Sequence, residues 1–170
     1  MPAIKKEFVI PDSTATSTLD CTSPIDTVNA PSAPFQAIDG AIALQTSSSS
    51  PDAMQTTATG ADDPSQRLFA KTALFVHGSE RSEILVLPEW SGRVRMWWGN
   101  TGRRQMADQF VVGPCHTDPD VWIVFPGGIV LAEPGCIDLI VRHDGRDTRV
   151  SMGVGAPCEG QGPPAEPSDS

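Results

Sequence analysis

The chain has 170 residues, 6% of them aromatic, and carries a formal net charge of −9 that is unevenly distributed. Residues 1–66 and 159–170 hold all of the excess acid, whereas residues 67–158 contain ten basic and ten acidic side chains and are neutral. Binding to a phosphate backbone requires clustered Lys and Arg, so no nucleic-acid partner is expected. The one dense basic group, within residues 93–104, is better explained as a solvated strand face and turn.

Neither a membrane span nor an export signal is predicted. The longest apolar runs, such as residues 121–125, are the size of a strand and too short for a transmembrane helix. Residues 1–10 begin with positive charge, but Glu7 interrupts them and Pro11 follows, so no apolar signal-peptide core forms. Three of the four cysteines nevertheless lie inside residues 67–158, which favours an oxidising compartment. We therefore expect a secreted or envelope-associated protein that uses an upstream start or a non-standard route, with the cytoplasm as the alternative.

Residues 1–66 are predicted to be disordered. The segment is rich in Ser, Thr, Ala, Pro and Asp, includes four consecutive serines at 47–50, and contains two phenylalanines as its only aromatic residues. Such a sequence buries too little apolar surface to offset the entropy of ordering it. We interpret it as a dispensable linker or, alternatively, a glycosylated tether, with residues 7–10 and 37–44 as the only candidate strands. Residues 159–170, rich in Gly, Pro and acids, are also predicted to be disordered.

Residues 67–158 predict an immunoglobulin-like antiparallel β-sandwich of seven or eight strands. Short β-branched or apolar runs alternate with Gly-, Pro- or Asn-containing turns, and no segment shows an extended helical period. The strongest turn signal is Asp144-Gly145, a dipeptide favoured in two-residue hairpins. Short strands at this spacing are typical of a sandwich or barrel. The expected strands are residues 68–76, 83–87, 93–97, 109–112, 121–125, 129–132, 137–142 and 149–154.

The strand directions predict where the cysteines lie. With Pro126-Gly127-Gly128 interpreted as a chain reversal, Cys115, Cys136 and Cys158 all fall at one end of the sandwich. We predict a Cys115–Cys158 disulfide, because it ties the last strand to an interior one, and Cys115–Cys136 is the alternative. The closed loop should stabilise the fold by about 4 kcal/mol in the chain-entropy description. The third thiol is then free or paired with Cys21.

No catalytic, metal or cofactor site is predicted. Zinc is the less favoured interpretation of the three cysteines and His116, because they lack the paired spacing of a zinc knuckle. Calcium needs six or more oxygens, and the loop at residues 118–120 shows only two carboxylates. Covalent catalysis needs a nucleophile beside a positioned base, whereas no serine sits in a nucleophile elbow and the histidines sit at predicted turns, namely His77, His116 and His143.

Trp97 and Trp98 are the most informative pair for binding. Neighbours in a strand face opposite sides, and the alternation of this strand places Trp98 in the core and Trp97 outside with Arg93 and Arg95. An exposed tryptophan beside arginines is a candidate platform for stacking and cation–π contacts with a ligand. The alternative is that the N-terminal hairpin or the arginine stems cover Trp97.

Short motifs at turns and strand ends carry a resemblance over residues 87–158. In order, they are Leu87-Pro88, Gly92-Arg93-Val94, Trp98-Gly99-Asn100, Pro114-Cys115, Trp122 with Phe125-Pro126-Gly127-Gly128, Pro134-Gly135-Cys136, and Gly153-Val154-Gly155-Ala156-Pro157-Cys158. This pattern resembles a functionally uncharacterised family of small secreted domains that is widespread in actinobacteria. The resemblance implies an envelope-associated or lipoprotein-like β domain and offers no catalytic residue.

The expected function is therefore a non-catalytic module that binds a protein or a wall polymer outside the cell. This expectation rests on fold class and family resemblance as well as on the residues. A structural spacer or assembly subunit is the first alternative, and an enzyme is the second. The partner and the oligomeric state do not follow from the sequence.

Overall fold

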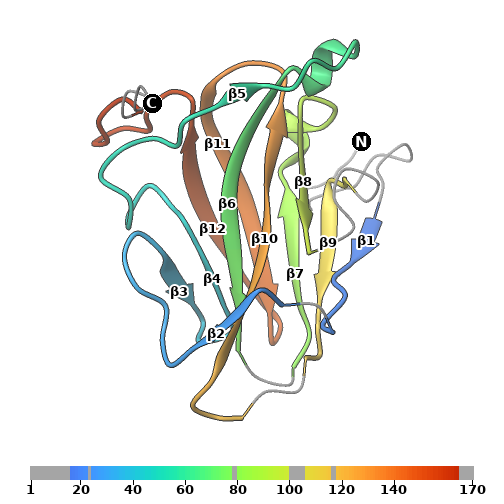
Figure 1. Ribbon diagram of the computed structural model, residues 1–170, viewed down its shortest axis with the longest axis vertical. Coiled ribbons are helices and arrows are strands. Elements are labelled where there is room, and N and C mark those ends of the chain that lie inside the picture. The colour runs from blue at the N-terminus through green and yellow to red at the C-terminus, as the bar shows by residue number, and fades with distance from the viewer. Residues whose placement is uncertain (1–15, 23, 78–79, 100–105, 116–117, 165–170) are drawn as a thin grey trace.

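The computed structural model describes residues 16–22, 24–77, 80–99, 106–115 and 118–164. These residues form twelve strands and two short 3-10 helices (Figure 1). The strands are β1 (Thr16–Thr18), β2 (Asp26–Val28), β3 (Gln36–Ile38), β4 (Ile42–Leu44), β5 (Thr57–Ala58), β6 (Leu68–Val76), β7 (Ser82–Val86), β8 (Val94–Trp98), β9 (Gln109–Val112), β10 (Trp122–Leu131), β11 (Gly135–His143) and β12 (Arg146–Val154), and the 3-10 helices are η1 (Pro64–Gln66) and η2 (Pro88–Trp90).

Two sheets pack face to face, which confirms the predicted all-β sandwich. The smaller sheet has the order β1-β9-β7-β11-β12, and the larger has the order β2-β10-β6-β4-β3, with β5 paired to β6 and β8 paired to β10. Among the described residues, β1 and β9 pair in parallel, and all other strand pairs are antiparallel. Between residues 67 and 158 the described residues form seven strands, as the sequence predicts.

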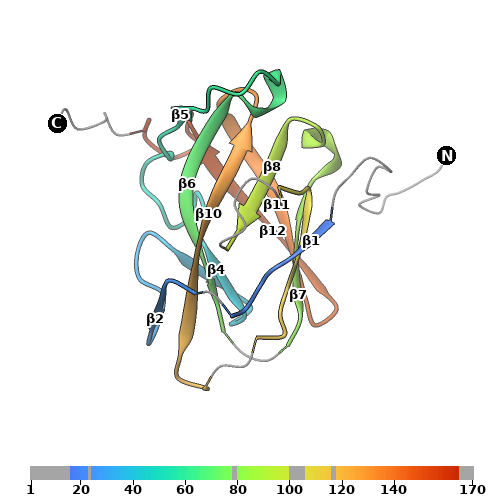
Figure 2. The same ribbon diagram turned by 45° about the vertical axis from the view of Figure 1, so that its right-hand side comes forward.

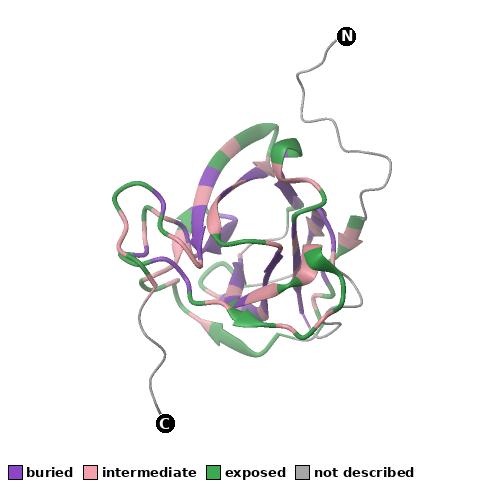
Figure 3. Cartoon of the chain, turned by 90° about the horizontal axis from the view of Figure 1, so that it is seen from above, coloured by how far each residue is buried: buried purple, intermediate pink, exposed green. Residues whose placement is uncertain are grey.

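The core lies between the sheets and follows the alternation of the strands. On β6, Ala70 and Leu74 face inward and are fully buried, and Phe110 of β9 and Phe125 of β10 meet them from either sheet. Figure 3 shows buried segments on the inside of the sandwich and exposed segments mainly in its loops. Burial of each large side chain contributes about 1.5–3 kcal/mol, so this shared core is the main stabilising contact between the sheets.

The prediction of disorder for residues 1–66 is wrong for the described part, residues 16–22 and 24–66. This segment supplies β1 to β5, and Ile42, Ala43 and Leu44 are completely buried. Asp39 and Gly40 both have positive φ, 53° and 66°, and join β3 to β4 in a tight hairpin. The candidate strand at residues 37–44 is confirmed as the β3–β4 hairpin, which docks on β6, whereas the other candidate, residues 7–10, lies outside the described residues. The core domain therefore begins well before residue 67.

The predicted C-terminal tail is also partly wrong. Residues 159–164 fold back on residues 50–53, where Gly162 donates a backbone hydrogen bond to Pro51 and accepts one from Ala53. The hairpin at Asp144-Gly145 is confirmed, with β11 and β12 joined directly by it.

The chain reversal at Pro126-Gly127-Gly128 is wrong as well. Strand β10 runs unbroken for ten residues, and the two glycines lie inside it. A Cβ atom on Gly127 would lie 2.0 Å from the Trp97 carbonyl oxygen, and one on Gly128 would lie 2.1 Å from the Ala70 carbonyl oxygen. The glycines therefore permit close approach of the flanking strands, which is the other common role of glycine in a strand.

Continuity of β10 reverses every later strand direction and changes the disulfides. The bonds are Cys21–Cys115 and Cys136–Cys158, so both predicted pairings of Cys115 are wrong. Cys115 follows the end of β9 where Val112 lies opposite Ser82, whereas Cys136 lies at the opposite end of β11. The cysteines thus form one staple at each end of the sandwich rather than one cluster.

The oxidised cysteines bear on zinc binding and on the redox state of the compartment. All four are paired, so the thiolates that zinc would require are not present. Two structural disulfides indicate an oxidising compartment. Among the described residues, the helical segments are too short to cross a lipid bilayer.

Both open sides of the sandwich are bridged. On one side Met96 of β8 exchanges two backbone hydrogen bonds with Ala107, just before β9. Figure 2 shows β8 on this side of the sandwich, next to β10. On the other side the segment between β4 and β5 crosses to the edge of β12, where Ser47 bonds Ser151 and Met54 bonds Gly153. These bridges cover strand edges that would otherwise be open to pairing with other chains. The segment that forms the second bridge also lies beside the outer face of β6.

Candidate functional site

One half of the outer face of the larger sheet is covered by the N-terminal segment. Phe75 of β6 and Trp122 and Val124 of β10 point outward there and are buried. Phe35, from the chain between β2 and β3, packs on Phe75 with ring centroids 4.7 Å apart. This half of the face is therefore closed to a ligand.

The other half carries an aromatic pair. Phe69 of β6 and Trp97 of β8 lie stacked across β10, with centroids 5.8 Å apart and planes only 8° apart. A Cβ atom on Gly128 would lie 2.7 Å from the Phe69 ring, so the absence of a side chain at Gly128 lets the ring lie over the strand. The glycine and the aromatic pair form one packing unit.

The predicted orientation of the tryptophan pair is confirmed, but the predicted cluster with the arginines is not formed as expected. Trp98 is in the core and only 1% exposed, whereas Trp97 lies half-buried on the outer face. Arg95 Nε lies 3.5 Å from the buried Asp108 carboxylate. Arg93 stacks instead on Trp90, 4.6 Å from the ring centroid. Trp97 therefore packs on Phe69, and both arginines are engaged elsewhere.

A pocket of about 740 Å³ opens on the outer face beside Phe69. Phe69 and Lys71 of β6 line it together with residues from two N-terminal segments. Both segments lie along the edge of β6 that faces away from β10 (Figure 1). We call it the outer-face pocket. It is lined by Ala33, Pro34, Gln45, Ser50, Pro51, Asp52, Ala53, Met54, Gln55, Thr57, Phe69 and Lys71.

Lys71 and Gln45 are two of the polar side chains that line the pocket. Lys71 is exposed, and no carboxylate of the described residues forms an ion pair with it. The Gln45 Oε1 atom accepts a hydrogen bond of 2.8 Å from the buried Thr72 hydroxyl. This bond fixes the amide, so Gln45 has its Nε2 donor left for a ligand.

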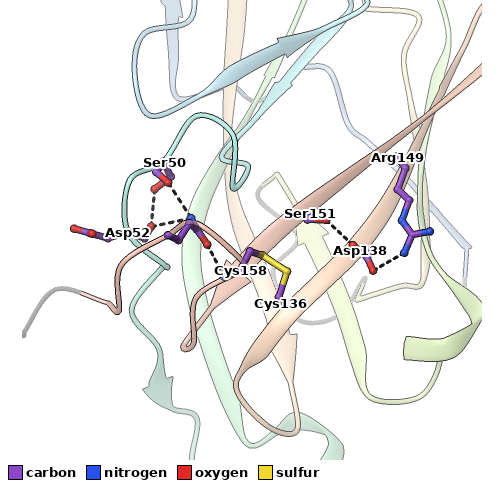
Figure 4. Close-up of a disulfide and its surroundings, with 8 residues drawn as sticks. Ser50, Asp52, Cys136, Asp138, Arg149, Ser151 and Cys158 are labelled. Atoms are coloured by element: carbon purple, nitrogen blue, oxygen red, sulfur yellow. Dashed lines mark hydrogen bonds and ion pairs between the residues drawn. A yellow bond between two sulfur atoms is a disulfide. The ribbon is translucent and has the colours of Figure 1, made fainter.

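Hydrogen bonds within the segment and from Gln161 hold residues 50–54, which form one wall of the pocket. Ser50 Oγ donates to the Asp52 carbonyl, and Gln161 Nε2 donates to the Ser50 carbonyl at 2.9 Å. Gln161 Oε1 accepts from the backbone amide of Cys158, whose disulfide to Cys136 anchors the segment to β11 (Figure 4). A wall fixed by covalent and hydrogen bonds presents a preorganised surface, which lowers the entropic cost of binding.

Sequence reasoning missed this pocket because it treated the walls as linker. Asp39-Gly40, between residues 36–38 and 42–44, is the same dipeptide signal for a hairpin as Asp144-Gly145. That dipeptide would have placed β3 and β4 in the sheet and shown that the following serine run is part of the fold. Ser50 of this run is in fact 7% exposed.

Two of the three histidines, His77 and His143, make structural contacts. His77 stacks on Trp122, and its two ring nitrogens lie 3.0 and 2.7 Å from the carbonyl oxygens of Gly40 and Pro119. It therefore joins the β3–β4 hairpin to the loop before β10. His116 lies outside the described residues, as do Arg103 and Arg104.

One cluster has the composition of a catalytic triad. Ser82 Oγ lies 2.9 Å from His143 Nδ1, and Glu80 Oε1 lies 3.4 Å from His143 Nε2. A serine nucleophile must reach the substrate carbonyl, whereas Ser82 is only 2% exposed. We interpret the contact as a hydrogen bond that closes the ends of β7 and β11.

The described residues contain no cluster of histidine, cysteine or carboxylate side chains that could hold a metal ion. Asp118 and Asp120, the loop carboxylates considered for calcium, are both exposed.

The fold and pocket together define a disulfide-stapled β-sandwich with a concave surface on one sheet. Comparison with protein-family models gives no match, and comparison with curated proteins gives none either. The resemblance to actinobacterial envelope domains therefore stays a prediction.

Proposed function

We propose that this protein is a non-catalytic binding module that acts outside the cell or in its envelope, and that the outer-face pocket binds a cell-wall polymer. The observation that carries the proposal is the pocket itself, in which the Phe69 ring lies beside the polar side chains of Lys71 and Gln45. Sugars present both an apolar C–H face and hydroxyl groups. An aromatic ring with a few convergent polar groups is complementary to both.

The exposed surface favours a polymer over a protein partner. Protein interfaces are centred on exposed aromatic or aliphatic anchors. Among the described residues, Ile25 at 61% is the only large hydrophobic side chain that is strongly exposed. The aromatic side chains of the outer face lie instead in or beside a concave, partly polar surface, which suits a narrow chain.

The location is supported by the two disulfides. They close loops of 94 and 22 residues, and such bonds persist in oxidising surroundings such as the periplasm or the cell exterior. We do not propose nucleic acid as a partner. Within the basic group at residues 93–104, Arg93 stacks on Trp90 and Arg95 lies beside Asp108.

A sedimentation assay with insoluble cell-wall polysaccharide tests the proposal. Wild-type protein should co-sediment, and Phe69→Ala should lose most of the bound fraction because the stacking surface is gone. Ile25→Ala is the matched control, since it removes an exposed apolar side chain outside the pocket. Circular dichroism must show that both variants are folded. Equal binding by the Phe69 and Ile25 variants would exclude the pocket, and no binding of any wall fraction by the wild type would overturn the function.

A further inference from the structure

The outer-face pocket places a positive charge where the rest of the chain is acidic. Lys71 is the only lysine among the described residues, and the whole chain carries a net charge of −9. It stands near the centre of β6 on the same face as Phe69, two residues earlier, so their Cα atoms are about 7 Å apart along the strand. No described carboxylate neutralises it, so the charge faces the pocket unpaired.

Gln45 adds a second donor on the same side. Its Oε1 atom is engaged by the Thr72 hydroxyl, and its Nε2 group is the remaining donor of a side chain that lines the pocket. An ammonium and an amide N–H together can bind two oxygens of one anionic group. Charge-assisted hydrogen bonds of this kind are stronger than neutral ones.

We infer that the pocket recognises an anionic group on a polysaccharide, with Lys71 and Gln45 binding the anion while Phe69 stacks on the adjoining sugar. The inference rests on the proposed function and names its ligand class. Carboxylate and phosphate groups share the required chemistry, since both offer two or more oxygens to a pair of donors.

The anionic groups of this ligand are widely spaced. Asp52 lines the same pocket, and the chain as a whole repels a polyanion. A ligand with a charge on every short repeat would meet that repulsion at each repeat, whereas a single anion would have its charge offset by Lys71. Asp52 can accept hydrogen bonds from sugar hydroxyls on the neutral part of the chain.

Isothermal titration calorimetry of the full chain tests the inference with defined probes. One pair is a short oligogalacturonate with a single free carboxylate and its fully methyl-esterified form, which differ in charge and little in shape. The phosphate arm is a neutral oligoglucoside carrying one phosphate, beside the same oligoglucoside without it. The variants are Lys71→Gln and Lys71→Arg, and Arg67→Gln is the control because it removes an exposed base outside the pocket lining.

The acidic member of at least one pair should bind about tenfold more tightly than its neutral partner, the effect expected for one charge-assisted contact. Lys71→Gln should abolish that difference, while Lys71→Arg and Arg67→Gln should keep it. The preferred arm identifies the anion as carboxylate or phosphate. Equal affinity for acidic and neutral members, or an unchanged difference in Lys71→Gln, would overturn the inference and leave the polymer-binding function intact. If the wild type binds none of these probes but still binds the wall fraction, the inference is likewise wrong and the function stands.

Discussion

Replacement of Gly127 by alanine tests how the larger sheet is built. The new Cβ atom would lie 2.0 Å from the Trp97 carbonyl oxygen and 2.7 Å from the Trp98 ring. Neither neighbour is the free end of a flexible side chain, because one is backbone and the other is a ring with 1% exposure. Strand β8 must therefore shift by roughly 1 Å or more to restore ordinary contact, and overpacking of this kind costs about 3 kcal/mol.

Urea unfolding at equilibrium, followed by tryptophan fluorescence with the disulfides intact, measures this cost. With a slope of about 2 kcal/mol per molar urea, a loss of about 3 kcal/mol lowers the midpoint by about 1.5 M. Gly135→Ala is the matched control, since its Cβ would meet only the Trp90 ring at 3.5 Å, an ordinary contact. We expect that variant to lie within about 1 kcal/mol of the wild type. A Gly127→Ala midpoint equal to that of Gly135→Ala would refute the close-approach role of Gly127.

Three further predictions concern stability. Replacing both cysteines of the Cys21–Cys115 bond by serine should lower the free energy of unfolding by about 4.7 kcal/mol, against about 3.4 kcal/mol for the Cys136–Cys158 bond, because the first bond closes the longer loop. The Cys21–Cys115 variant should therefore have the lower thermal midpoint, and the reverse order would contradict this. Gln161→Ala should cost about 1–2 kcal/mol by leaving the buried carbonyl of Ser50 without its donor. Protease susceptibility of residues 50–54 measures this loss, with the exposed Glu133→Ala as the control. The backbone amide and then the hydroxyl of Ser65 donate to the Asp63 carboxylate and hold its pKa below the usual 3.8. The stability that ionised Asp63 contributes is therefore complete above about pH 4 and is lost as the pH falls through its lowered folded-state pKa. Urea unfolding should then show a smaller acid-induced loss of stability for Asp63→Asn than for the wild type. Identical pH profiles for the two proteins would argue against the cap.

Local sequence signals predicted the parts of the fold that depend on local physics. Alternation along β8 correctly placed Trp98 inside and Trp97 outside, because side-chain direction in a strand is a backbone property. Asp144-Gly145 correctly predicted a hairpin, since few other residues adopt two consecutive positive φ angles. The other strands between residues 67 and 158 followed from the same two kinds of signal, except that residues 121–125 and 129–132 were predicted as two strands and form the single strand β10.

Long-range packing decided what the sequence left open. Two consecutive glycines are compatible with a turn or with a strand that neighbours approach closely, and the packing of Phe69 and Trp97 on β10 selects the second. That choice sets the direction of every later strand, and hence the partner of Cys115. Strands β2 to β5 are two or three residues long, too short to be stable alone. They are held in the sheet by the longer strands β6 and β10, which pair with β4, β5 and β2.

The pocket was the least predictable feature. Phe69 and Lys71 come from β6, and its walls come from residues near 33, 45 and 50–57, which meet only when the N-terminal segment folds over the sheet. Lys71 looks like an ordinary solvated residue of an alternating strand until those walls are present.

The two disulfides determine how the molecule responds to a pulling force. Tension applied outside Cys21 and Cys158 passes through the two covalent bonds and bypasses the residues enclosed by each. The load falls on the segment between Cys115 and Cys136, which contains β10. If β10 were pulled out of the sheet, these roughly 20 residues could extend to at most about 70 Å. The residues enclosed by each disulfide would not be stretched, because the covalent bonds carry the tension past them. A domain stapled in this way can yield over a short distance and still hold its two ends together.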